Sequence, residues 1–284
     1  MIIACSPRVL YPNLDWLIPW YVNDYVSLDR SQSSQVSARL AHQLDWHCRT
    51  QLPQYAIFIR EIRRDVEING QALTLERLAV YNDRLTRHWY ILLEQITPDI
   101  IDILVSATDE QISELFENLE RKNREMESKF VEPPPQEVNR TRQKRMQKRL
   151  SYWFSHLTGS QKQAVAKWSA QLEPIAADWI AHRRRVQHAA KHLAERRDNS
   201  VKFKTEFFDL LTNSRKLRTE NYQETIDINT ERTLALLAEL SNTLSPTQKT
   251  HFSNRLQSLV TDLDRLSCDP ALKANRADIY LPDY

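Results

Sequence analysis

The chain has 284 residues, 41% hydrophobic and 27% charged, and its 39 lysines and arginines against 37 aspartates and glutamates leave a formal net charge of +2. A chain of this length and composition can bury a sizeable core, which excludes wholesale disorder. It has only 2 glycines, where average usage of ~7% would give about 20. This scarcity argues against Rossmann and P-loop folds and turn-rich β sandwiches, which depend on glycine. The near-neutral net charge gives no global electrostatic reason to bind nucleic acid.

The first residues, Met1-Ile2-Ile3-Ala4-Cys5-Ser6, read like the end of a bacterial lipoprotein signal, in which small and aliphatic residues precede a cysteine that is cleaved and acylated. We expect Cys5 to carry the lipid and residues 1–12 to form a tether. A full signal needs an apolar stretch of 7–15 residues before the cleavage point, so we expect a start upstream of Met1 or a trimmed chain. A short terminus with an incidental thiol is the alternative. No later stretch is apolar and uncharged for long enough to span a membrane.

Aromatic residues concentrate between Asn13 and Tyr25. At helical spacing, Trp16, Trp20 and Tyr21 share one face, although Pro19 would interrupt or kink the helix. Such a face must be covered by the body of the protein, by a membrane or by a partner. We favour core packing, since aromatic residues near termini commonly fix the chain end to the core, and docking of a partner is the alternative.

Apolar residues recur at helical spacing along most of the remaining chain. The predicted helices cover 29–48, 55–66, 73–96, a short segment from Pro98 to Val105, 108–130, 161–168, 174–197, 220–240 and 246–266. Pro133-Pro134-Pro135 is the one clear break, and no stretch alternates as a strand does. We therefore predict an all-α fold without a β-sheet, with long amphipathic helices packed antiparallel in a single domain over 13–268 and a C-terminal tail over 269–284.

A basic stretch follows the proline break. It contains Arg140, Arg142, Lys144, Arg145, Lys148 and Arg149. It could bind phosphate, lipid headgroups, RNA or a protein partner. We favour a solvated helix face neutralised by the acidic run from Glu114 to Glu132, because a basic run inside a balanced chain usually faces water or acidic neighbours.

One local pattern recurs at helix starts. Asp29, Thr108, Thr158 and Ser245 are each followed three residues later by glutamine. Each is a capping box, in which the cap oxygen accepts from a first-turn amide and the glutamine bonds back to the cap amide. The unequal spacings exclude a solenoid of identical units, and capping alone explains the pattern.

The search for catalytic motifs gives no nucleophile elbow, phosphate loop or paired CxxC. His188 and His192 lie four residues apart, with Glu195 one turn on. That spacing could place metal ligands on one helix face, but no motif supplies the rest of a site, so we favour structural or solvent-facing histidines. We predict a non-enzyme that uses no cofactor and no small-molecule substrate.

The cysteine count is compatible with an oxidising compartment. With Cys5 acylated, Cys48 and Cys268 remain as an even pair and could bridge the first and last large helices. Two unrelated buried thiols are the favoured alternative.

Several segments together resemble an uncharacterised family of predicted lipoproteins from Gram-negative bacteria. They are Leu14–Tyr21, Asp24–Val26, Trp46-His47, Leu52-Pro53, Tyr55, Asn123–Glu125, Trp179, Arg183–Arg185 and Leu244–Gln248. Membership implies a helical periplasmic protein anchored through Cys5, and Ser6 after the cysteine implies the outer membrane by the usual sorting rule. The family brings no established activity.

The Leu-Ser/Thr-x-x-Gln helix starts at Leu157 and Leu244 are also similar to those of the periplasmic Spy and CpxP chaperones, which hold unfolded clients on a concave surface. The first functional hypothesis is therefore a chaperone-like protein of the cell envelope with apolar patches and basic rims such as 140–149. The second is an adaptor that holds one specific protein at the outer membrane through the segment from Trp16 to Tyr25. Neither hypothesis involves nucleic acid.

Overall fold

The computed structural model describes residues 7–68, 73–198 and 200–268, and within these ranges every regular element is helical. The elements are α1 (Pro7–Leu10), η1 (Tyr11–Asn13), α2 (Leu14–Asn23), α3 (Arg30–Trp46), the π-helical turn η2 (His47–Gln51), α4 (Leu52–Ile68), α5 (Leu75–Ser106), α6 (Asp109–Phe130), α7 (Pro135–Phe154), α8 (Gly159–Gln171), α9 (Ala176–Ala194), α10 (Val201–Thr212), η3 (Ser214–Leu217), α11 (Glu220–Asn242) and α12 (Pro246–Leu266). The all-α prediction is confirmed.

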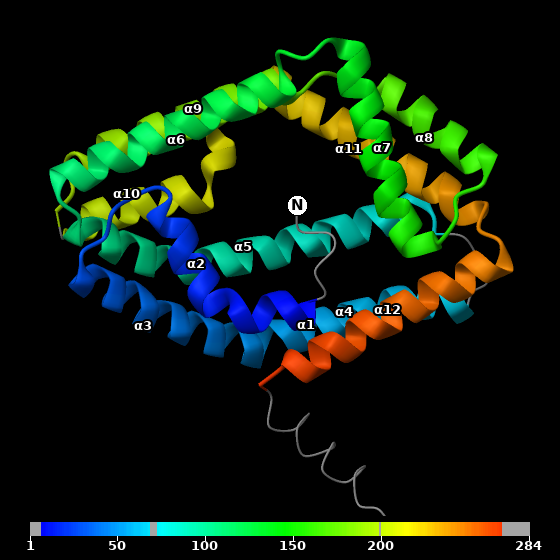
Figure 1. Cartoon of the computed structure of the whole chain (residues 1–284), viewed down its shortest axis with the longest axis horizontal. Coiled ribbons are helices and arrows are strands. Elements are labelled where there is room, and N and C mark those ends of the chain that lie inside the picture. The colour runs from blue at the N-terminus through cyan, green and yellow to red at the C-terminus, as the bar shows by residue number, and fades with distance from the viewer. Residues whose placement is uncertain (1–6, 69–72, 199, 269–284) are drawn as a thin grey trace, which may run out of the picture.

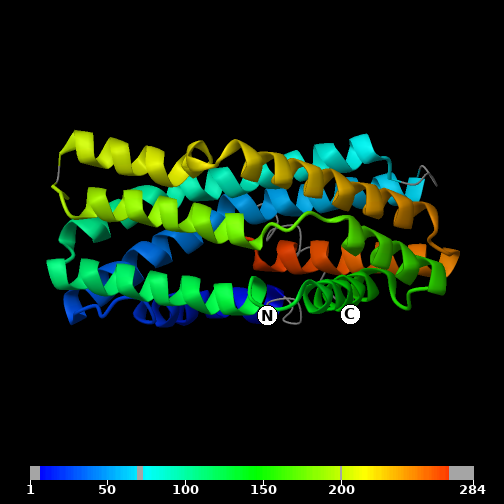
Figure 2. The same ribbon diagram turned by 90° about the horizontal axis from the view of Figure 1, so that it is seen from above.

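The helices form an elongated frame (Figure 1). Helices α6 and α9 run together along one long side, α3, α4 and α12 make the opposite side, and α5 runs lengthwise between them. Helices α7, α8 and α11 close one end of the frame (Figures 1 and 2).

Neighbouring helices pack antiparallel. Between α4 and α12, Arg60 Nη2 lies 2.6 Å from Asp264 Oδ2, and one turn further along α4 Arg63 Nε donates to Ser253 Oγ at 3.2 Å. The residue numbers rise along one helix as they fall along the other, which defines the direction. Helices α6 and α9 are also antiparallel, as predicted from the sequence for the long helices.

The buried apolar residues form clusters distributed around the frame. One cluster joins α7, α8 and α11 around Val165 and Leu240, and another joins α5, α6, α9 and α10 around Ile101 and Phe207. Smaller clusters lie along α4, against α12 and against α5. A core divided in this way leaves room for a pocket where two clusters approach one another.

The capping boxes pair with one another, which the sequence did not predict. Gln161 Nε2 donates to Gln248 Oε1 at 3.1 Å, and Gln248 Nε2 donates back to Gln161 Oε1 at 2.9 Å. Each amide also donates to a carbonyl two residues before the other cap, that of Thr243 or that of His156. The starts of α8 and α12 are therefore joined by a closed ring of hydrogen bonds, with Gln161 1% and Gln248 5% exposed.

The same arrangement joins the starts of α3 and α6 at the other end of the long axis (Figure 1). Gln32 and Gln111 exchange hydrogen bonds of 2.9 and 2.6 Å, and their amides donate to the carbonyls of Ser106 and Ser27. These carbonyls again stand two residues before the partner cap. At both ends of the frame, paired glutamine side chains therefore join two helix starts. The glutamines make tertiary contacts in addition to capping their own helices.

A disulfide joins Cys48 to Cys268, with the sulfur atoms 2.12 Å apart and a sequence separation of 220 residues. Cys48 lies in the π-helical turn between α3 and α4, and Cys268 follows the end of α12. The alternative of two unrelated buried thiols, which we favoured from the sequence, is wrong in this structure. The bridge closes the chain from Cys48 to Cys268, which includes α4 to α12, into one loop.

The region expected to be a tether is partly folded. Residues 7–12 belong to α1 and η1, where Tyr11 packs against the cluster around Cys48 and its hydroxyl lies 3.0 Å from His47 Nδ1. Cys5, the expected lipid site, and the expected tail over 269–284 lie outside the described residues.

Prolines interrupt the helices less than expected. Helix α5 continues through Pro98 instead of restarting there, and Thr97, fully buried, donates its hydroxyl to Leu93 O at 2.6 Å. Pro19 likewise lies inside α2. Helix α10 was not predicted from the sequence; its buried Phe203 and Phe207 pack against α5 and α9.

Candidate functional site

An apolar pocket lies where α4, α5, α11 and α12 meet the end of α7. Its volume is about 350 Å³, at the lower end of the range typical of ligand pockets. The side chains that line it are mostly aliphatic or aromatic: Ile62, Val66, Leu73, Leu78, Tyr81, Leu85, Phe154, Leu234, Leu237, Leu244 and Phe252. The pocket lies between two of the core clusters, that of Phe58 and Tyr81 and that of Leu240.

The pocket opens beside exposed apolar side chains on α5. Leu85 lines the pocket and is nevertheless 56% exposed, and Trp89, one turn further along α5, is 58% exposed. Residues four apart on a helix lie on the same face. An apolar surface therefore runs from the pocket on to the exposed face of α5, where it is available to an apolar group from outside the chain.

The polar groups of the pocket are few and do not form a catalytic set. The lining includes Asn82, Thr233, Ser241 and Lys249, with no carboxylate and no histidine. Tyr81 is engaged structurally, because its hydroxyl donates to Asp65, and burial together with this bond raises the pKa of Tyr81 to about 12. A pocket with this lining can bind an apolar side chain or alkyl group but offers no acid–base pair.

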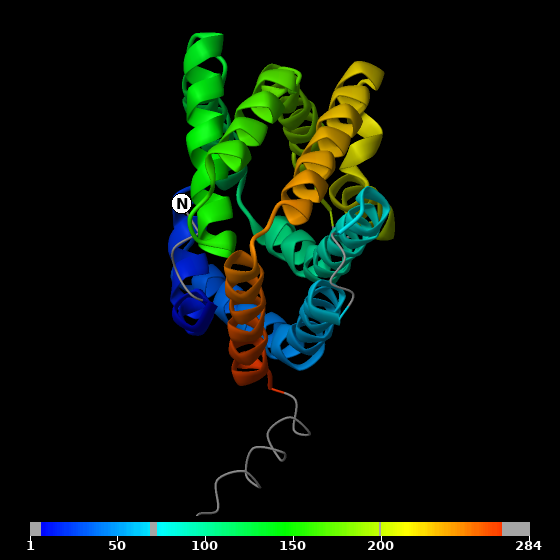
Figure 3. The same cartoon turned by 90° about the vertical axis from the view of Figure 1, so that its right-hand side faces the viewer.

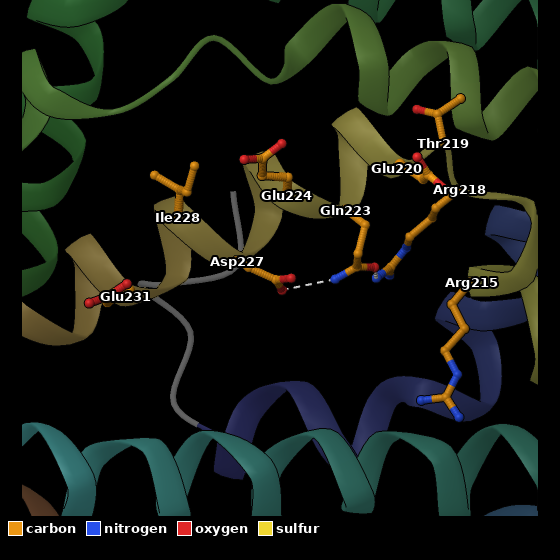
Figure 4. A pocket seen from close by; sticks show the side chains of 9 residues that line it. All are labelled: Arg215, Arg218, Thr219, Glu220, Gln223, Glu224, Asp227, Ile228 and Glu231. Carbon is orange, nitrogen blue, oxygen red and sulfur yellow. Dashed lines mark hydrogen bonds between the residues drawn. The ribbon is translucent and has the colours of Figure 1, made fainter.

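A second hollow, of about 540 Å³, lies along α11 and differs in character. Figure 4 shows Glu224, Asp227 and Glu231 along the helix, with Arg215 and Arg218 at one end. Gln223 bridges the two groups, since its Nε2 donates to Asp227 at 2.8 Å and its Oε1 accepts from Arg218 at 2.9 Å. Arg218 and Asp227 of this hollow are thus already engaged through Gln223, so we do not regard the hollow as the main site.

The histidine pair expected as a weak metal candidate lies on α9. The rings of His188 and His192 are 4.5 Å apart between centroids, and His192 Nδ1 lies 3.7 Å from Glu195. His188 lines a hollow of about 1010 Å³ between α6 and α9. Over the ranges that the structure describes, no group of three or more histidine, cysteine, aspartate or glutamate side chains is arranged to hold a metal ion.

The aromatic segment on α2 is not packed in the core. Trp16 is 59%, Trp20 64% and Tyr21 55% exposed. Trp16 Nε1 donates to Asn13, and Tyr21 bonds to Tyr25 hydroxyl to hydroxyl, but these are surface contacts. The favoured expectation of core packing was therefore wrong for these three residues, because α2 lies over α3 with this face turned outwards.

Three arginines of the basic stretch, Arg142, Arg145 and Arg149, were possible partner-binding residues, and on α7 they have different roles. Arg142 is half-buried, its guanidinium donates to Ser169 O at 3.0 Å, and burial lowers its pKa. Arg145 stacks on Phe130 at 5.4 Å while remaining exposed, and Arg149 is exposed without an ion pair in the described chain. Arg142 therefore has a structural role.

The acidic run on α6 does not neutralise α7, contrary to the explanation favoured from the sequence. Glu120 and Glu127 hold Arg184 of α9 at 2.9 and 2.8 Å, which raises the pKa of Arg184 and lowers the pKa of both carboxyls. Glu114 accepts from Ser27. Glu114, Glu120 and Glu127 thus bind α9 or the segment before α3, and Glu125 pairs with Arg121 and Lys122 of α6 itself.

In the described part of the chain, no helix is both long enough and apolar enough to cross a membrane. A family of unknown function, DUF6279, matches residues 24–223. No curated protein and no solved structure matches the chain.

Proposed function

The chain belongs to this family of unknown function, DUF6279, whose match covers more than two thirds of its length, and we propose that it is a non-enzymatic protein that binds unfolded protein clients through the pocket beside α5. The observation that carries the proposal is an apolar pocket continuous with Leu85 and Trp89, which are both more than half exposed. Exposed apolar surface next to a concave site is typical of protein interaction sites.

The chemistry of the pocket favours a protein segment over a metabolite. A small-molecule site usually places a few convergent polar groups to fix its ligand, whereas here the polar atoms are scattered and Lys249 is the only charged lining residue. Apolar contacts without directional bonds tolerate many different side chains, which is what a chaperone-like protein needs.

The proposal is tested by aggregation of a reduced, unfolded model protein, followed by light scattering with and without the full chain. The test variant is Leu85→Ala with Trp89→Ala. Truncating two contact residues should weaken client binding by about ten-fold or more. The matched control is Trp16→Ala with Trp20→Ala, which removes a pair of similarly exposed residues at the same spacing.

We expect the wild-type chain and the α2 control to suppress scattering and the α5 variant to lose most of this effect. No suppression by the wild-type chain at several-fold molar excess would refute the proposal. A pull-down that recovers one dominant protein, lost in the α2 variant and kept in the α5 variant, would instead identify the alternative, an adaptor that holds one specific partner through α2.

We further propose that this protein works in the periplasm, attached to the outer membrane by a lipid on Cys5. Support comes from the cysteine context at Met1–Ser6, and a disulfide between Cys48 and Cys268 is compatible with an oxidising compartment. Labelled fatty acid should enter a protein expressed with its native upstream region. Incorporation that persists after Cys5→Ser would refute the anchor.

A further inference from the structure

Helix α7 carries a set of cations without acidic partners. The exposed members are Arg140, Lys144, Arg145, Lys148 and Arg149. None of them forms an ion pair with a side chain in the described ranges, because the carboxylates of α6 bind elsewhere. The one acidic residue of α7, Glu137, lies in its first turn, before the cations begin.

The cations cover the side of α7 that faces away from the protein. At ~100° per residue, the five positions fan over roughly half of the helix circumference, with Lys148 at the centre. The opposite side carries Met146 and Leu150, which pack into the core cluster. Arg142 lies at the border between the two sides and donates to Ser169 O of α8. The basic face is therefore set by how α7 packs.

A helix that carries exposed aromatic residues lies on the same side of the molecule as α7. Helix α2, with Trp16 and Trp20, and helix α7 both lie on one side of the frame, which is the left side in Figure 3 and the lower side in Figure 2. Near the end of α7, Tyr152 is 39% exposed and the guanidinium of Arg255 lies 3.7 Å from its ring centroid. Tryptophan, tyrosine and basic residues together are typical of surfaces that lie at a membrane interface.

We propose that this side of the protein docks on a membrane surface rich in anionic phospholipids, with the α7 cations contacting lipid phosphates. Exposed cations spread over about 14 Å of helix, at 1.5 Å per residue, suit an extended array of headgroups better than they suit one small ligand. Each basic side chain near such a surface contributes to binding through its charge. The docked side leaves the pocket beside α5 as a separate site.

The test uses co-sedimentation of the full chain with vesicles of phosphatidylcholine alone or mixed with phosphatidylglycerol. Cys5→Ser is present in every protein so that no acyl chain contributes. The variant Lys144→Gln with Lys148→Gln should bind the mixed vesicles about 30-fold more weakly. The matched control, Lys202→Gln with Lys216→Gln, removes equal charge from side chains 84% and 63% exposed on the other side of the frame, and should bind as the parent does.

The parent chain should bind the mixed vesicles and release them as salt is raised, with much weaker binding to phosphatidylcholine alone. Equal binding to both vesicle types would overturn the proposal, as would equal losses in the two variants. Binding of the protein through its α7 cations to an acidic protein or a nucleic acid, with no binding to vesicles, would also overturn the proposal. Circular dichroism of each variant identifies a loss that comes from misfolding.

Discussion

The paired capping boxes make a prediction that separates tertiary pairing from simple helix capping. Gln161→Ala removes the bond of 3.0 Å that the Thr158 amide donates to Gln161 Oε1, and both bonds with Gln248. It also removes a donor from the Thr243 carbonyl. The cap bond is worth about 1 kcal/mol and each buried amide bond about 1 kcal/mol more, so the expected loss of unfolding free energy is about 3–4 kcal/mol.

The assay is a double-mutant cycle measured by urea unfolding, with circular dichroism and tryptophan fluorescence as coincident probes. The cycle comprises Gln161→Ala, Gln248→Ala and the double variant, and Ser245→Ala serves as a control that removes a cap alone. Because the two glutamines exchange two bonds, the coupling free energy should be about 1–2 kcal/mol. A coupling near zero, with each glutamine costing no more than Ser245→Ala, would refute the reasoning.

Three further predictions address the rest of the fold. Cys48→Ser should lower the unfolding free energy by about 3–5 kcal/mol, because the bridge closes a very long loop, and non-reducing gels should show slower migration; unchanged stability would contradict a formed disulfide. Burial lowers the pKa of His47 in the folded state, so near and below pH 6.5, the ordinary pKa of histidine, the unfolded state binds more protons than the folded state. The unfolding free energy should therefore fall as pH drops from about 7.5 to 5.5. The same pH dependence in His47→Gln would show that another group causes it. Trp168→Ala, at a site 7% exposed, should cost about 3–5 kcal/mol, and Trp20→Ala, at 64% exposed, within about 0.5 kcal/mol of zero; equal costs in thermal unfolding would contradict the packing.

Local features of the fold follow directly from the sequence. The start of α12 at Pro246 and its end at Leu266 were predicted to the residue, because Ser245 caps the helix, proline stands at its first position and the apolar spacing continues to Leu266. The missed α10 and the continuous α5 have a common reason. Both depend on tertiary burial, of Phe203 and Phe207 in one case and of Thr97 in the other, which propensity does not encode.

The candidate site could not be predicted, since it depends on contacts between distant segments. Leu85 and Leu237 are ordinary members of two amphipathic stripes, and only the packing of α5 against α11 places both in one pocket. The same holds for the glutamine pairs, whose members are separated by 79 and 87 residues. The spacing of Trp16 and Trp20 predicted a common face correctly but could not say whether anything covered it.

Client binding at the pocket is tested most directly by photo-cross-linking. A photoreactive phenylalanine analogue is placed at Leu85 or, as a control, at Val201, which is 82% exposed on a different helix, and each protein is irradiated with the same reduced, unfolded model protein. We predict abundant cross-links from position 85, few from position 201, and none from either when the model protein is native. Equal yields from the two positions, or cross-links from position 201 alone, would contradict binding beside α5.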